Sequence, residues 1–105
     1  MSVHIIDISG LKSNDLVKLR KLLAFFDDFS YYEERKLFGK KILWCEPEDM
    51  NETLDVAGVD CQINLLRDEI STLPVEEAKE LRKEIFDLKS LKIILRKCKE
   101  EYLEE

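Results

Sequence analysis

The sequence is poor in glycine and proline, with three and two among its 105 residues. A phosphate-binding loop needs several glycines close together, whereas Gly10, Gly39 and Gly58 each stand alone. Nucleotide binding through a P-loop or a dinucleotide fingerprint is therefore excluded at the level of motifs. The scarcity of both residues also argues against a disordered chain and favours helix.

Long apolar runs are absent too. No run approaches the ~18 residues that a membrane-spanning helix requires. The opening residues, from Met1 to Asp7, lack the basic segment that begins a secretory signal peptide. We therefore expect a cytoplasmic protein that makes no contact with a membrane. The length predicts a single domain, 1–105, whose one hydrophobic core folds without metal or disulfides.

The cysteines lack any paired motif. Cys45, Cys61 and Cys98 are an odd number with no Cys-x-x-Cys spacing, which argues against a disulfide framework and fits a reducing compartment. His4 would complete the donor set of a zinc site, but structural zinc ligands come in closely spaced pairs and these four residues are far apart. We therefore predict reduced cysteines, no metal and no cofactor.

Recognisable catalytic motifs are also missing. His4 is the only histidine and no serine, cysteine or aspartate lies in a nucleophile motif, so acyl transfer is not expected. Asp7, Glu34 and Lys36 have the residue types of a metal-dependent nuclease. Within this set Glu34-Arg35-Lys36 forms a Glu-x-Lys triplet, and such triplets arise by chance in a chain with 38% charged residues. We therefore predict no catalytic residues and keep the nuclease only as an alternative.

The negative charge is concentrated in one segment. The formal net charge of −6 argues against a general affinity for nucleic acid. Residues 46–60 contain no base and six acids: Glu46, Glu48, Asp49, Glu52, Asp55 and Asp60. This acidic segment is either a solvated loop or a surface that docks on a basic face of a partner protein. The partner-binding residues that we predict are Glu48, Asp49, Glu52 and Asp55.

The first half of the chain predicts a small sheet and one helix. Residues 3–8 are rich in β-branched residues and are apolar on both parities, which indicates a strand buried on both faces. Residues 14–28 repeat leucine at helical spacing. Residues 30–37 and 40–46 favour a hairpin with Gly39 in its turn, although 29–38 could instead continue the helix.

The second half predicts a helical hairpin of residues 60–72 and 74–103, separated at Pro74. A helix of about thirty residues would be roughly 45 Å long, which exceeds the domain. Its apolar residues form one seam, and Phe86, Ile93 and Leu103 lie off it. The excess length suggests pairing of two copies. The dimer-interface residues that we predict are Leu81, Ile85, Leu88 and Leu95.

Together these patterns predict an α+β fold, with a sheet of two or three strands on the first helix and a C-terminal helical hairpin; a mainly α fold is the alternative. The function that they favour is a non-enzymatic protein-protein interaction module. It would be a small inhibitor or modulator, of the kind that phages and mobile elements encode, that docks through its acidic segment. The alternatives are a metal-dependent nuclease and a purely structural homodimeric subunit.

Overall fold

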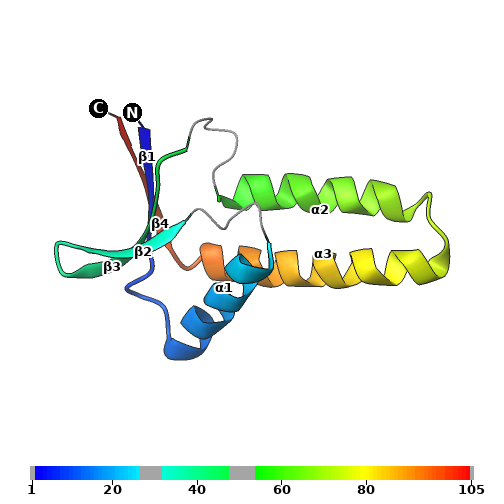
Figure 1. The fold of residues 1–105 in the computed structure, drawn as a ribbon, viewed down its shortest axis with the longest axis horizontal. Coiled ribbons are helices and arrows are strands. Elements are labelled where there is room, and N and C mark those ends of the chain that lie inside the picture. Colours follow the sequence, from blue (N-terminus) through cyan, green and yellow to red (C-terminus); the bar gives the residue numbers. More distant parts are fainter. Residues whose placement is uncertain (1, 27–31, 48–53, 105) are drawn as a thin grey trace.

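A four-stranded antiparallel sheet and three helices make up the fold, as seen in a computed structural model (Figure 1). The structure describes residues 2–26, 32–47 and 54–104. The predicted α+β class with a C-terminal helical pair is confirmed. In chain order the elements are β1 (Ser2–Asp7), α1 (Ser13–Phe25), β2 (Glu33–Leu37), β3 (Lys40–Cys45), α2 (Val56–Ile70), α3 (Val75–Leu95) and β4 (Lys99–Glu104).

The sheet has the order β2-β3-β1-β4, so β1 lies in its interior between β3 and β4. Successive side chains of a strand point to opposite faces. His4 and Ile6 of β1 therefore point toward the helices, whereas Val3 and Ile5 lie on the other face, where they pack with Ile42. All these side chains are buried, which explains why β1 is apolar on both parities.

The predicted hairpin forms between β2 and β3, with Leu37 opposite Lys40. Phe38 and Gly39 make the turn with φ of 52° and 78°. Positive φ at both central residues suits the right-handed twist of the strands, and Gly39 adopts it without steric cost. The alternative of a helix across 29–38 is wrong for residues 33–37; residues 29–31 lie outside the described residues.

One prediction needs correction at the C-terminus. The helix expected over 74–103 ends at Leu95, and residues 99–104 form β4, which pairs with β1 along its whole length. Without β4, β1 would leave a row of backbone N–H and C=O groups unpaired at an edge. The sheet therefore has four strands rather than two or three, and α3 is about 32 Å long rather than 45 Å.

The second helix also begins earlier than its predicted start at residue 60. Asp55 is the N-cap of α2, and its carboxylate accepts a hydrogen bond from the backbone N–H of Gly58 at 2.6 Å. This bond satisfies one of the free N–H groups at the helix start. Helix α2 consequently takes up residues 56–60 of the acidic segment. Helix α1 ends at Phe25, and residues 27 and 28 of its predicted range lie outside the described residues.

Helices α2 and α3 project from the sheet as a long hairpin, and α1 packs beside the sheet-proximal part of α3 (Figure 1). The molecule extends over 50 × 31 × 19 Å. We call residues 64–84, at the far end of the hairpin, the arm, and the other described residues the body. Within the arm only Ala78 is buried. No helix among the described ranges has both the length and the apolar character to cross a membrane.

Candidate protein-interaction surface

One face of α3 carries large side chains that nothing in the described structure covers. Val75, Phe86 and Ile93 are 69%, 68% and 57% exposed. They belong to a row whose members follow each other in alternating steps of four and three residues, which places them along one line of the helix. We call this row the outer seam; its residues are Val75, Lys79, Arg82, Phe86, Lys89, Ile93 and Arg96, all exposed.

The outer seam contains four cations and no acid. Within α3, Glu76 is the only acid three or four residues away from a seam cation, which is the spacing at which helical side chains interact. None of Lys79, Arg82, Lys89 and Arg96 forms an ion pair with another described residue. A cationic surface with exposed apolar residues thus lies on a protein of net charge −6.

The predicted dimer-interface residues lie on a different face of α3. Ile85, Leu88 and Leu95 are 8%, 1% and 2% exposed and belong to the chain's own core. Leu81 is partly buried in the arm. A contact between two copies could therefore not use Ile85, Leu88 or Leu95 without opening the core.

Of the predicted partner-binding residues, Glu48, Asp49 and Glu52 lie outside the described residues. Asp55 caps α2, as described above. Asp60, in the same segment, binds the ammonium group of Lys92 and so joins α2 to α3. Both described aspartates of this segment therefore have structural partners.

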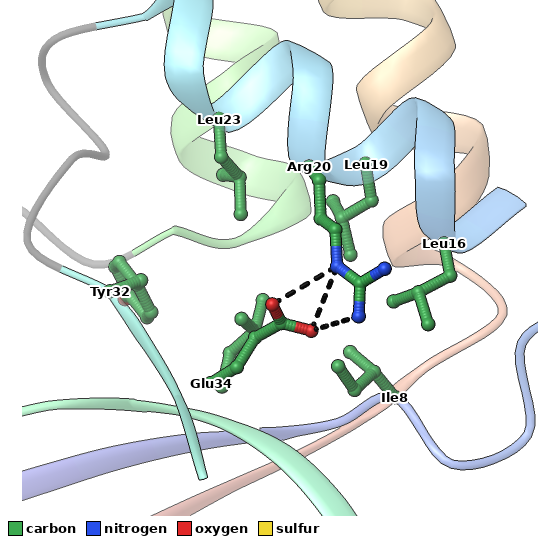
Figure 2. Close-up of a pocket in the computed structure, with 8 residues that line it drawn as sticks. Ile8, Leu16, Leu19, Arg20, Leu23, Tyr32 and Glu34 are labelled. Atoms are coloured by element: carbon green, nitrogen blue, oxygen red, sulfur yellow. Dashed lines mark hydrogen bonds and ion pairs between the residues drawn. The ribbon is translucent and has the colours of Figure 1, made fainter.

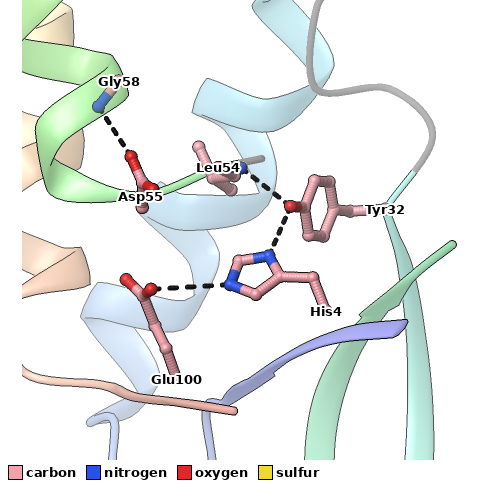
Figure 3. A network of polar contacts seen from close by, with 6 residues as sticks. All are labelled: His4, Tyr32, Leu54, Asp55, Gly58 and Glu100. Carbon is pink, nitrogen blue, oxygen red and sulfur yellow. Dashed lines mark hydrogen bonds and ion pairs between the residues drawn. The ribbon is translucent and has the colours of Figure 1, made fainter. Parts of the chain in front are cut away.

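The only histidine belongs to a buried polar network (Figure 3). His4 Nδ1 lies 2.6 Å from the hydroxyl of Tyr32, and this hydroxyl also accepts a hydrogen bond from the backbone N–H of Leu54 at 2.7 Å. Nε2 of His4 lies 3.5 Å from the carboxylate of Glu100. The network joins β1, the residue before β2, the segment before α2, and β4.

Burial sets the protonation of this network. It lowers the pKa of His4 below its ordinary value, against a smaller raising effect of Asp55, and it raises the pKa of Glu100. The imidazole has no exposed surface, so a substrate cannot reach it in this conformation. What the arrangement can do is hold four segments together, and it has no open face for acid-base chemistry.

The alternative nuclease residues are not brought together. In the sheet Asp7 is aligned with Ile42 and Glu34 with Leu43, so the two carboxylates point to opposite faces. Asp7 accepts hydrogen bonds from Ser9, which lower its pKa, and faces Lys40 at 3.9 Å. Among the described residues, no three histidine, cysteine or acidic side chains are grouped so as to hold a metal ion.

Glu34 instead binds Arg20 across a cleft between α1 and the sheet (Figure 2). Arg20 Nε and Nη2 donate to both carboxylate oxygens at 2.9–3.1 Å, and this contact raises the pKa of the guanidinium. The cleft has a volume of about 160 Å³, and its other walls are five aliphatic side chains and Tyr32. The two charged groups among the described lining residues bind each other, so neither is available to a polar ligand.

The three cysteines lie on separate parts of the fold. Cys45 is buried in β3, Cys61 is exposed on α2, and Cys98 is half-buried between α3 and β4. Burial raises the pKa of Cys45, and it raises the pKa of Cys98 to about 11. These two thiols therefore stay protonated at neutral pH and are poor nucleophiles.

Sequence reasoning missed the outer seam, although a signal for it was present. Phe86 and Ile93 fall off the inner apolar seam and are seven residues apart, so they share a second face. The clustering of cations on that face is found only when the residues are projected around the helix, and not when charges are counted along the sequence. No protein-family model, curated protein or solved structure matches this chain.

Proposed function

We propose that this chain is a non-enzymatic protein-protein interaction module of the cytoplasm and that it binds its partner through the outer seam of α3. The observation that carries the proposal is the exposure of Phe86 and Ile93 among four cations that form no ion pair with any described residue. Aromatic and arginine side chains are enriched where proteins bind each other. A module of this size would act as an inhibitor or modulator by occupying a surface of its partner.

The arm supports the same proposal. Its helices lie side by side (Figure 1) but gain little burial, so the side chains on the outward side of the hairpin are covered by no other described residue. A partner helix laid along the outer seam would add a third helix to the pair. That contact buries apolar surface without any loss of the existing core.

Site-specific photo-cross-linking in the cells that make the protein tests this function. A photoreactive phenylalanine replaces Phe86 in one variant and Val17, which is 48% exposed on α1, in the control. We expect a discrete cross-linked protein from position 86 and none from position 17. The same products from both positions, or no product from position 86, would contradict the proposal.

The acidic segment is a second candidate surface, favoured by six acids without a base in residues 46–60. Its partner would be a basic face of a protein. The triple variant Glu48→Lys, Glu52→Lys and Asp49→Lys should slow association and weaken its salt dependence. Asp55 is unsuitable for this test because its replacement also removes the cap of α2. An unchanged association rate would contradict docking through this segment and support its interpretation as a solvated loop.

A further inference from the structure

We infer that the outer seam takes one class of partner, an acidic amphipathic helix of a different protein. This inference rests on the proposed function and names the chemistry of the partner. It depends on three properties of the seam: the spacing of its residues, the sign and position of its charges, and the repulsion of these charges against a second copy of the seam.

The spacing selects a helix. Alternating steps of four and three residues are the heptad pattern in which two helices pack along a shared seam. Val75, Phe86 and Ile93 supply the apolar contacts, and the row from Val75 to Arg96 is about 32 Å long. A straight, narrow line of this length fits a second helix better than a globular pocket. A partner helix also presents a contact residue every three or four positions, so its contacts can match successive seam residues.

The charges select an acidic partner. The four cations of the seam lie between and beside its apolar residues, so a helix that reaches Phe86 must also approach the cations. Their long stems can pack on apolar surface while the charged ends extend to the flanks. Glutamates or aspartates beside the partner's apolar line would neutralise these ends and set the register.

The same charges exclude a second copy along this seam. Two outer seams facing each other, parallel or antiparallel, would bring four cations from each chain together. Like charges at such short range are destabilising, and the six apolar residues of two seams are few to offset eight cations. The seam therefore disfavours self-pairing and favours a partner of opposite charge.

Other anionic surfaces fit less well. A helix that lies on a membrane needs a wide, continuous apolar face, whereas cations interrupt the apolar line of the seam at four of its seven positions. Nucleic acid would be repelled by the net charge of −6, and phosphates would not use exposed Phe86 and Ile93.

Three synthetic peptides of one length and a full-length charge-reversal variant test the inference. The first peptide forms a helix with leucines at heptad spacing flanked by glutamates. The second has lysines in place of the glutamates, and the third has the composition of the first in scrambled order. The seam variant carries Lys79→Glu, Arg82→Glu and Lys89→Glu. Its matched control carries Lys18→Glu, Lys21→Glu and Lys36→Glu, which change the charge equally at exposed positions elsewhere.

We expect the native protein to bind the glutamate peptide, measured by fluorescence anisotropy, and to bind the scrambled peptide at least about tenfold more weakly. The seam variant should lose about tenfold in affinity for the glutamate peptide and bind the lysine peptide instead. The control variant should change by about twofold or less. Equal binding of the ordered and scrambled peptides, or equal losses in both variants, would overturn the inference.

Phosphatidylserine-rich vesicles and a short DNA duplex are the competing probes. Tighter binding of either than of the glutamate peptide would also overturn the inference. Its failure is distinguishable from failure of the proposed function, because the position-86 cross-link reports any protein partner. A cross-link to a segment that is neither acidic nor helical leaves the function standing and removes this inference, whereas no cross-link removes the function.

Discussion

The arm and the adjoining part of α3 differ in composition and in burial: residues 85–95 are far richer in large apolar residues than residues 64–84. Residues 64–84 contain one buried side chain, that of Ala78, whereas residues 85–95 contain five: Ile85, Leu88, Leu91, Ile94 and Leu95. The arm helices pack on each other, with Leu66 and Ile70 at the edge of the core, whereas the second stretch lies in the core cluster that includes residues of the sheet and α1. Stability is therefore concentrated in the body, which leaves the arm free to present a binding surface.

The largest effect that would test this difference is expected from two leucines of α3. Leu91 has no exposed surface in the body, whereas Leu81 is only partly buried in the arm. Leu91→Ala should lower the free energy of unfolding by about 2–5 kcal/mol, because it leaves a cavity in the core. Leu81→Ala should cost clearly less, as measured by urea denaturation. Equal losses would show that the arm is as tightly packed as the body.

The buried hydroxyl of Tyr32 should give the next largest effect. Tyr32→Phe removes the acceptor of the Leu54 N–H and the partner of His4, and leaves both polar groups buried. The free energy of unfolding should fall by about 1–3 kcal/mol. Phe86→Ala on the outer seam is the comparison and should stay within about 0.5 kcal/mol of the native protein. A larger loss for Phe86→Ala would mean that the seam contributes to the fold.

His4 should make the stability of the body depend on pH. Because burial lowers its pKa, only the unfolded chain takes up a proton just below the ordinary value of 6.5. The free energy of unfolding is therefore highest above about pH 6.5 and falls as the pH is lowered toward the folded-state pKa. Glu100 acts in the opposite direction, because its raised pKa favours the protonated, folded form as the pH falls.

Urea denaturation between about pH 5 and 7 measures this dependence, and His4→Phe is expected to flatten it. The free energy of local opening of the arm, measured by hydrogen exchange of its amides, should show no histidine contribution to its pH dependence. Residues 64–84 contain no histidine. A slope that persists in His4→Phe would assign the pH dependence to other groups.

The parts of the fold that could be predicted are those set by local pattern. Residues 3–8 are apolar on both parities because β1 is an interior strand, and Gly39 suits the positive φ of the hairpin turn. The C-terminal strand could not be predicted in this way. Lys99–Glu104 is rich in charged residues that favour helix, and its pairing with β1 joins opposite ends of the chain.

The outer seam could not be predicted from a count of charges along the sequence. Counted along the chain, residues 75–105 contain nearly equal numbers of acids and bases and look neutral. Around the helix, the cations of the outer seam separate from acids such as Glu80, Glu84 and Asp87. The His4 network could not be anticipated either, because Tyr32, Leu54 and Glu100 reach it only through the tertiary fold.

The smallest effect concerns two lysines of α3 that are three residues apart. Lys92 forms an ion pair with Asp60 of α2, whereas Lys89 lies on the outer seam without an ion pair to any described residue. Lys92→Ala should lower the free energy of unfolding by about 0.2–1 kcal/mol, a small amount because both groups are partly exposed and screened by solvent. Lys89→Ala should leave stability nearly unchanged yet weaken binding of the glutamate peptide. The opposite assignment, with Lys89 stabilising and Lys92 binding, would place the interaction surface on the inner side of the hairpin.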